Sequence, residues 1–296
     1  MSGHHHHNVS GKNLFITIIL NIIITLSQIV GGILSGSLAL LSDSMHNFSD
    51  VLALFIAYFA NRLATQPNNK SKTFGYKRAE ILAALFNASV LVAIALFLII
   101  EAIHKFYHPE AINSTWVIGL GILSIILNAL SVLLIKDDAH DNMNIKAAYL
   151  HLLTDVMTSV AVVVGGVLMY YFHIFWIDPI ISILIALYLL WASFDLVKES
   201  SAILMQFTPK DIDIEEIITM IESQPEIKNV HHIHIWKLDE HSIHLEAHLD
   251  FRKDLWLSHS SKIIDILEKK LHDNFDIEHS TFQCEYNRDD NKEKIV

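Results

Sequence analysis

The sequence predicts an α-helical membrane protein with six transmembrane helices and a small cytoplasmic α+β domain. Three observations support this fold class. Of the 296 residues 52% are hydrophobic, and the mean hydropathy is +0.39. Residues 14–34, 81–100 and 116–135 carry no charge, and about 20 such residues span a bilayer core as a helix. Beyond residue 206 the pattern changes to short alternating segments, which are typical of a small two-layer domain.

The predicted spans contain one feature that marks two of them as unusual. The second and fifth spans carry ionisable residues and are therefore the weakest in hydropathy. The sixth span is predicted to start at Asp178-Pro179, an acidic N-cap followed by proline at the first helical position. The first apolar run is too long for a signal-peptide core, so we expect permanent spans. The six spans are 14–34, 38–62, 79–107, 114–135, 145–172 and 178–199.

Basic residues outside the spans set the expected orientation. With the N-terminus in the cytoplasm, nine of them fall on the cytoplasmic side and only Lys105 on the other. Short loops rich in Lys and Arg stay in the cytoplasm. We therefore expect both termini in the cytoplasm and, for a bacterial protein, a location in the inner membrane. The nine are Lys12, Arg62, Lys70, Lys72, Lys77, Arg78, Lys136, Lys146 and Lys198.

The chain is predicted to have four parts. These are a His-rich segment at 1–13, a transmembrane domain at 14–206, an α+β domain at 207–287 and a charged, frayed tail at 288–296. The four histidines at 4–7 suit either a native metal-gathering segment or the remnant of an expression tag. In the α+β domain we expect helix 212–223, strands 230–238 and 242–251, helix 258–275 and strand 277–286, in the order αββαβ.

The charge and the cysteine content of the chain limit which binding partners and cross-links are expected. The formal net charge is −11, and residues 207–296 alone hold 11 basic against 20 acidic side chains. This excess of acidic side chains disfavours nucleic acid as a partner. It suits a domain that handles cations, although acidic side chains are often simply solvated surface residues. Cys284 is the single cysteine, which excludes an internal disulfide. Strand alternation places Cys284 on the core side with Phe282 and Tyr286, as a small apolar residue.

Two His/Asp pairs lie inside the predicted membrane region. His46 precedes Asp50 by four residues, and His151 precedes Asp155 by four. Residues at i and i+4 share a helix face, and both pairs are expected near the bilayer midplane. Two such faces supply four nitrogen and oxygen ligands, enough for a tetrahedral site. This set suits Zn²⁺, whereas Mg²⁺ and Ca²⁺ prefer oxygen alone.

Other interpretations of these residues exist. The two pairs could instead be His–Asp ion pairs that hold helices together. An intramembrane metal-dependent hydrolase would need a general base and an open coordination position. The chain has no His-Glu-x-x-His, and four protein ligands leave no open position, so we do not expect an enzyme. Asp43, one turn outward of His46, could support the ligands, line an exit path or cap a helix.

Four segments resemble the cation diffusion facilitator family, in its zinc-transporter branch with His-x-x-x-Asp on two helices. They are 36–50 (GSLALLSDSMHNFSD), 74–87 (FGYKRAEILAALFN), 150–155 (LHLLTD) and 230–236 (VHHIHIW). The resemblance implies a homodimer in membrane lipid that exports divalent metal by exchange with protons. Zinc is the expected substrate, with cadmium and cobalt as further candidates. A membrane zinc sensor or receptor and a passive metal channel remain alternatives.

The resemblance also implies a second metal site in the cytoplasmic domain. Residues that match His231, His248, His279 and Glu285 contribute to such a site in similar transporters, where zinc would act as a regulatory ligand. The residues themselves support this in part, because strand alternation places His248 and Glu285 on one exposed surface. Since nine histidines lie between residues 231 and 279, several of them could equally be solvated surface imidazoles.

Overall fold

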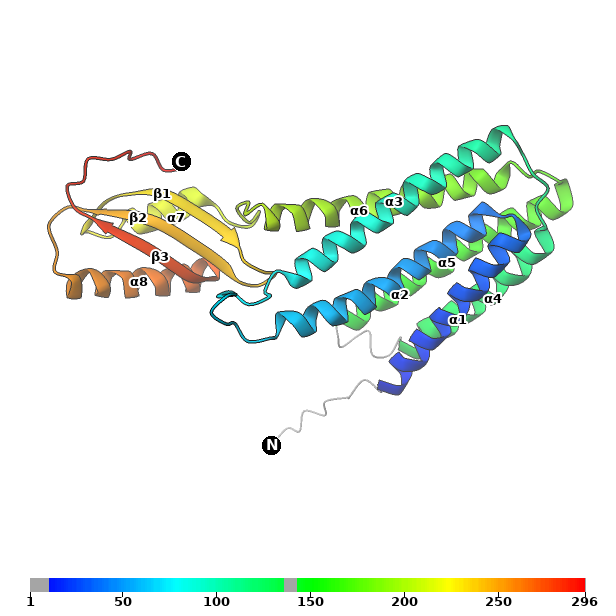
Figure 1. Cartoon of the computed structure of the whole chain (residues 1–296), viewed down its shortest axis with the longest axis horizontal. Coiled ribbons are helices and arrows are strands. Elements are labelled where there is room, and N and C mark those ends of the chain that lie inside the picture. Colours follow the sequence, from blue (N-terminus) through cyan, green and yellow to red (C-terminus); the bar gives the residue numbers. More distant parts are fainter. Residues whose placement is uncertain (1–10, 136–142, 296) are drawn as a thin grey trace. The chain divides into compact units, whose positions relative to one another are not determined.

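The computed structural model describes residues 11–135 and 143–295 (Figure 1). The histidines at 4–7 and the loop at 136–142, with His140, were singled out from the sequence and lie outside the described residues. The chain forms two compact units. One consists of residues up to 58 together with 86–197, and the other of 59–85 together with 198–296. Each is described by itself.

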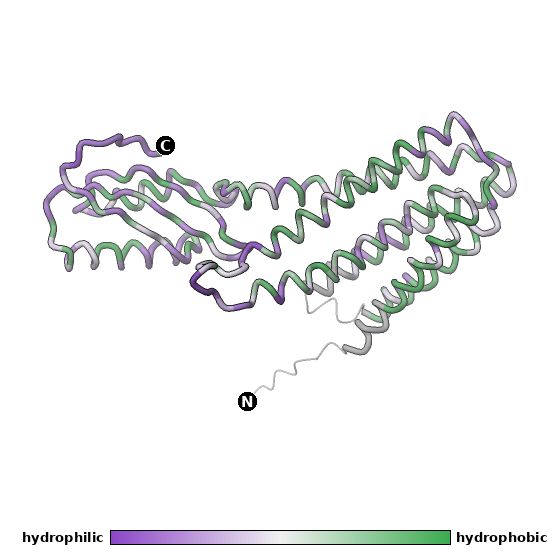
Figure 2. Tube along the Cα trace, viewed as in Figure 1, coloured by the Kyte–Doolittle hydropathy of each residue, from purple (hydrophilic) through white to green (hydrophobic). Residues whose placement is uncertain are grey.

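All six predicted long helices are present, and hydrophobic residues predominate along them (Figure 2). Within the described residues, α3 to α6 each contain a stretch long and apolar enough to cross a membrane, and α1 contains a shorter one, Ile19–Ser35. The α2 helix has 27 residues, but its Asp and His side chains lower its hydropathy, as expected. The helices are α1 Gly11–Ser35, α2 Leu38–Ala64, α3 Ala79–Tyr107, α4 Ser114–Ile135, α5 Met143–Phe172 and α6 Ile177–Leu204.

Glycines allow α4 to approach its neighbours α1 and α5 closely. A Cβ atom added to Gly31 in α1 would lie 1.8 Å from Cδ1 of Leu120, and one added to Gly121 would lie 2.5 Å from Cγ2 of Val163. Both distances are far below van der Waals contact, so a side chain at either position would force the facing residue to move. Small residues at helix crossings are the usual way in which membrane helices pack tightly.

The start of α2 is organised by a residue from α6. Gly36 takes a positive φ of 72° in the turn between α1 and α2, a conformation that glycine adopts without strain. Asp178 is fully buried and accepts hydrogen bonds from the backbone N–H groups of Leu38 and Ala39. The expectation that Asp178 caps its own helix was wrong, because α6 begins at Ile177 and the carboxylate is directed to the free N–H groups of α2.

The second unit contains the predicted αββαβ domain: α7 Ile214–Glu222, β1 Ile227–Lys237, β2 Ile243–Phe251, α8 Leu257–Phe275 and β3 Ile277–Glu285. The sheet order is β1-β2-β3, with β1 antiparallel and β3 parallel to β2. As predicted, alternate residues of β2, from Ile243 to Phe251, are buried. They form one core with Ile217 of α7 and Leu267 of α8.

The assignment of Cys284 to the core was wrong. Cys284 is exposed, whereas the next residue, Glu285, is only 5% exposed. Cys284 pairs with the buried Leu249 of β2. Because β3 is an edge strand, the end of β3 that carries Cys284 is left uncovered on the core side. Glu285 is buried on the opposite side by the residues that follow the strand, as described below.

The tail at 288–296 was expected to be frayed, but part of it is hydrogen-bonded to β1. The register of β1 against β2 shifts between His231 and His234, and His232 has a positive φ of 52°. Such a bulge removes residues from the ladder. The N–H groups of His232 and Ile233 instead donate to the carbonyl oxygens of Glu293 and Lys294, at 3.1 and 2.9 Å.

Candidate metal centre

Helices α2 and α5 bring the four residues singled out inside the membrane region into one cluster. Nε2 of His46 lies 3.6 Å from Oδ1 of Asp155. Nε2 of His151 lies 3.1 Å from Oδ2 of Asp50 and 3.8 Å from Oδ2 of Asp155. The two imidazole rings are 5.6 Å apart at 72°. Each helix thus contributes one imidazole and one carboxylate to a shared space, as the i, i+4 spacing predicts.

The two most buried residues of this cluster, His46 and Asp155, have polar atoms without hydrogen-bond partners among the described residues. Both ring nitrogens of His46 and both carboxylate oxygens of Asp155 are buried without a hydrogen-bond partner among the described residues. A buried polar atom without a partner costs about 1–3 kcal/mol. A divalent cation would bind one ring nitrogen of His46 and the carboxylate of Asp155 together, since one atom each from His46, His151 and Asp155 lies within 4.8 Å of the others.

The four ligand candidates differ in their access to solvent. The side chain of Asp155 is 1% exposed and that of His46 10%, whereas Asp50 is 23% and His151 40% exposed. Asp50 and His151 are the members nearest the predicted cytoplasmic ends of α2 and α5. The more exposed ligand candidates therefore lie toward one end of the two helices and the buried ones toward the other.

Asp43, whose role the sequence left open, does not join the four-residue cluster. Its carboxylate accepts hydrogen bonds from Nε2 of Gln28 in α1 at 2.6 Å and from the hydroxyls of Thr158 and Ser159 in α5 at 2.8 and 3.1 Å. Nδ2 of Asn47 extends this network by donating to Oε1 of Gln28. Asp43 therefore joins α1, α2 and α5 on the side of the cluster toward the start of α2.

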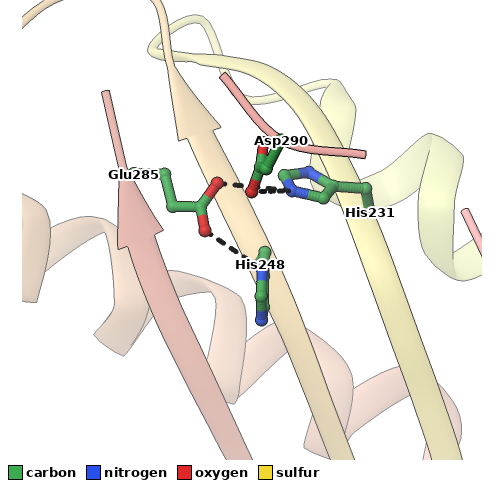
Figure 3. Close-up of side chains that lie close together, drawn as sticks. All are labelled: His231, His248, Glu285 and Asp290. Atoms are coloured by element: carbon green, nitrogen blue, oxygen red, sulfur yellow. Dashed lines mark ion pairs between the residues drawn. The ribbon is translucent and has the colours of Figure 1, made fainter. Parts of the chain in front are cut away.

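A second cluster lies on the three strands of the α+β domain (Figure 3). Nδ1 of His248 in β2 is 3.0 Å from Oε1 of Glu285 in β3, and Nε2 of His231 in β1 is 3.3 Å from Oε2 of the same residue. Asp290, in the segment after β3, places Oδ2 3.6 Å from Nε2 of His231. One ligand atom from each of the four lies within 4.8 Å of the others. Nitrogen and carboxylate ligands in this arrangement fit a zinc ion.

His279 is not part of this second cluster, although the resemblance grouped it there. It is exposed at the start of β3, and its ring lies 5.0 Å from that of His244. Asp290 was not singled out because the tail has no secondary-structure pattern. The only sequence signal was its position five residues beyond Glu285 in an acidic stretch.

Comparison with known protein domains finds a match in each of the two parts of the chain. Residues 14–205 match the cation efflux transmembrane domain, and residues 209–287 match the cytoplasmic domain of cation efflux proteins. The chain belongs to the cation efflux family. This is the cation diffusion facilitator family that the four sequence segments resemble, so the recognition made from those segments is confirmed.

Three relatives show how far the similarity extends. The cadmium, cobalt and zinc/H⁺-K⁺ antiporter of Bacillus subtilis is 37% identical over 95% of this chain and 91% of its own length. The metal cation efflux system protein CzcD of Cupriavidus metallidurans is 34% identical over 96% and 90%. The zinc transporter ZitB of Escherichia coli is 34% identical over 88% and 83%. The cation efflux family is a family of transporters; two of these three names specify zinc, and the third specifies a metal cation.

The cytoplasmic cluster of this family member is electrostatically balanced by cations. Burial raises the pKa of Glu285, but hydrogen bonds from Lys292 and Gln283 outweigh burial and hold that pKa below 4.5. A hydrogen bond from Lys292 lowers the pKa of Asp290 to about 2. Burial lowers the pKa of His248, and it outweighs the carboxylate of Glu285, which raises that pKa. Two anionic carboxylates and a neutral imidazole are the protonation states that metal ligation requires.

Proposed function

We propose that this member of the cation efflux family exports Zn²⁺ from the cytoplasm in exchange for protons, with Cd²⁺ and Co²⁺ as further substrates. The observation that carries the proposal is that the buried side chains of His46 and Asp155 have no hydrogen-bond partner among the described residues and lie 3.6 Å apart, next to the partly exposed His151 and Asp50. The names of the three relatives support the same class of substrate.

Proton exchange follows from the chemistry of the ligands. An imidazole must be deprotonated to bind a metal, so zinc binding at His46 and His151 displaces any protons that they hold. Histidine has an ordinary pKa of about 6.5 and changes charge in the physiological range. A site that holds either protons or metal, and that opens to one face at a time, couples the two flows.

Two further features complete the proposal. The protein is a homodimer in the bacterial inner membrane, with both termini in the cytoplasm, as the basic loops indicate. The cytoplasmic cluster binds Zn²⁺ as a regulatory ligand through His231, His248, Glu285 and Asp290, where Asp290 takes the place first assigned to His279. The close approach of these four side chains supports this assignment.

Zinc flux into proteoliposomes, with and without a pH gradient, tests the transport proposal. We expect gradient-dependent flux that is lost in Asp155→Ala and in Asp50→Ala, both as folded dimers. Asp195→Ala, at an exposed position of α6, is the matched control and should transport normally.

Each other outcome selects a different function. Flux that ignores the pH gradient would indicate a passive channel, and tight zinc binding without flux would indicate a sensor or receptor. Normal flux in Asp155→Ala would refute the assignment of the site. Zinc-dependent hydrolysis of generic substrates would revive the enzyme interpretation.

A further inference from the structure

The residues after β3, 287–295, return along the sheet to its opposite edge, and we call this segment the C-terminal strap. It starts at the end of β3, one edge strand, and is hydrogen-bonded to β1, the other edge strand. The bulge in β1 makes this possible, because it leaves the N–H groups of His232 and Ile233 without partners in β2. They donate to the carbonyl oxygens of Glu293 and Lys294.

Side chains add to this attachment. Nζ of Lys294 donates to the carbonyl oxygen of Val230 at 3.0 Å and forms an ion pair with Glu222 in α7. Nη1 of Arg288 lies 2.9 Å from Oε1 of Glu285. These contacts tie the strap to the domain on both sides of Asp290 and Lys292, the two residues that face the second cluster.

The ammonium group of Lys292 lies among the candidate metal ligands. Nζ is 3.1 Å from Oε2 of Glu285 and 3.4 Å from Nε2 of His231, and it forms an ion pair with Oδ1 of Asp290. Oδ2 of Asp250 is 4.0 Å away. Three of the four side chains that would bind zinc, Glu285, His231 and Asp290, therefore already bind the chain's own cation. His231 is fully buried beneath this arrangement.

We propose that Lys292 is an internal competitor for the metal, so that zinc binding displaces its ammonium and loosens the C-terminal strap from residue 292 onward, while Asp290 becomes a ligand. This inference depends on the proposed cytoplasmic zinc site. Its physical basis is that an ammonium and a Zn²⁺ ion a few ångströms apart repel each other strongly in a partly buried site. Both need the oxygens of Glu285 and Asp290, so the two states exclude each other.

Competition of this kind has a measurable consequence. The apparent affinity of a ligand is its intrinsic affinity multiplied by the fraction of protein in the binding-competent state. A strap that is closed nine-tenths of the time would therefore weaken zinc binding about tenfold. Lys292→Met removes the charge but keeps an unbranched side chain, and it should tighten zinc binding by on the order of tenfold. Lys292→Arg keeps the charge and should bind zinc as the unaltered protein does.

The test measures zinc affinity on the full-length protein in detergent, in an Asp50→Ala, Asp155→Ala background that removes the intramembrane site. Lys253→Met, at an exposed position after β2, is the matched control and should not change the affinity. His248→Ala identifies the cytoplasmic site, because zinc binding should be lost in it.

Amide hydrogen exchange on the same samples supplies a second measurement. Zinc should accelerate exchange at His232 and Ile233, whose acceptors lie in the strap, and should slow exchange at Leu249 in the centre of the sheet. A chelator should reverse both effects.

The outcomes separate the inference from the proposal beneath it. If zinc binds and His248→Ala abolishes binding, but Lys292→Met has no effect and His232 exchanges more slowly with zinc, the site stands and the competition is refuted. If none of the variants binds zinc, both the cytoplasmic site and the inference are refuted, whereas the transport proposal is unaffected.

Discussion

Asp178 and Leu38 are 140 residues apart in the sequence, and the carboxylate of Asp178 accepts a hydrogen bond of 2.7 Å from the backbone N–H of Leu38. The contact joins the first turn of α6 to the first turn of α2, the helix that carries His46 and Asp50. An anion at a helix N-terminus satisfies free N–H groups and interacts favourably with the helix dipole. The ligand-bearing helix is thus anchored at its start by a residue of a different helix.

Replacing Asp178 should therefore destabilise the bundle. We expect Asp178→Ala to lower the free energy of unfolding by about 2 kcal/mol, at the upper end of measured helix caps, because the N–H groups of Leu38 and Ala39 lose their acceptor inside the protein. Thermal unfolding in detergent measures this, with Asp195→Ala as control. Equal melting temperatures for the two variants would contradict the anchoring role.

Asp43 should contribute to stability more than to zinc binding. Asp43→Asn replaces one carboxylate oxygen by an NH2 group, which cannot accept a hydrogen bond, so at least one of the donors Gln28, Thr158 and Ser159 loses its acceptor. Leaving such a group unsatisfied costs about 1–3 kcal/mol. We expect a lower melting temperature with the zinc affinity of the intramembrane site retained. Thr158→Val, which removes one donor, should show a smaller effect of the same kind. Unchanged stability with lost zinc binding would show that Asp43 is a ligand.

The close approach of α4 to α5 can be tested with two neighbouring glycines. Gly121→Ala should destabilise the protein by about 1–3 kcal/mol, because the new methyl group meets the stiff, β-branched Val163. In Gly119→Ala the added methyl group has nothing within 4 Å, so the substitution should be neutral or slightly stabilising through the helix propensity of alanine. Thermal unfolding and zinc flux of both variants check this. A similar loss in both would mean that helix packing is not the cause.

The turn between β1 and β2 should weaken in acid. Burial raises the pKa of Asp239, but N–H groups of Ser242 and His241 and the ammonium of Lys77 outweigh burial and hold that pKa below 3.8. A lowered folded-state pKa contributes stability above pH 3.8 that is lost as the pH falls through the folded value. We expect the protection of the Ser242 amide against hydrogen exchange to fall below about pH 4. In Asp239→Asn protection should be lower at pH 6 and should not show this step; an identical pH profile would refute the assignment.

The sequence by itself determined the features that depend on local spacing. Long apolar runs predicted six helices because the bilayer thickness sets the length of an uncharged span. The i, i+4 spacing of His46 with Asp50 and of His151 with Asp155 predicted two matched faces, because helix geometry makes residues four apart neighbours. Alternation along residues 243–251 predicted the core side of β2, since successive side chains of a strand point to opposite faces.

The tertiary structure decided the features that depend on which distant segments meet. Asp178 binds α2 rather than its own helix, and Cys284 is exposed because β3 is an edge strand, which local alternation does not reveal. Asp290 joins the second cluster in place of His279 because a bulge in β1 leaves N–H groups free to bind the strap. Backbone hydrogen bonds left free by a sheet are bound by whatever segment reaches them, and spacing along the chain carries no record of that segment.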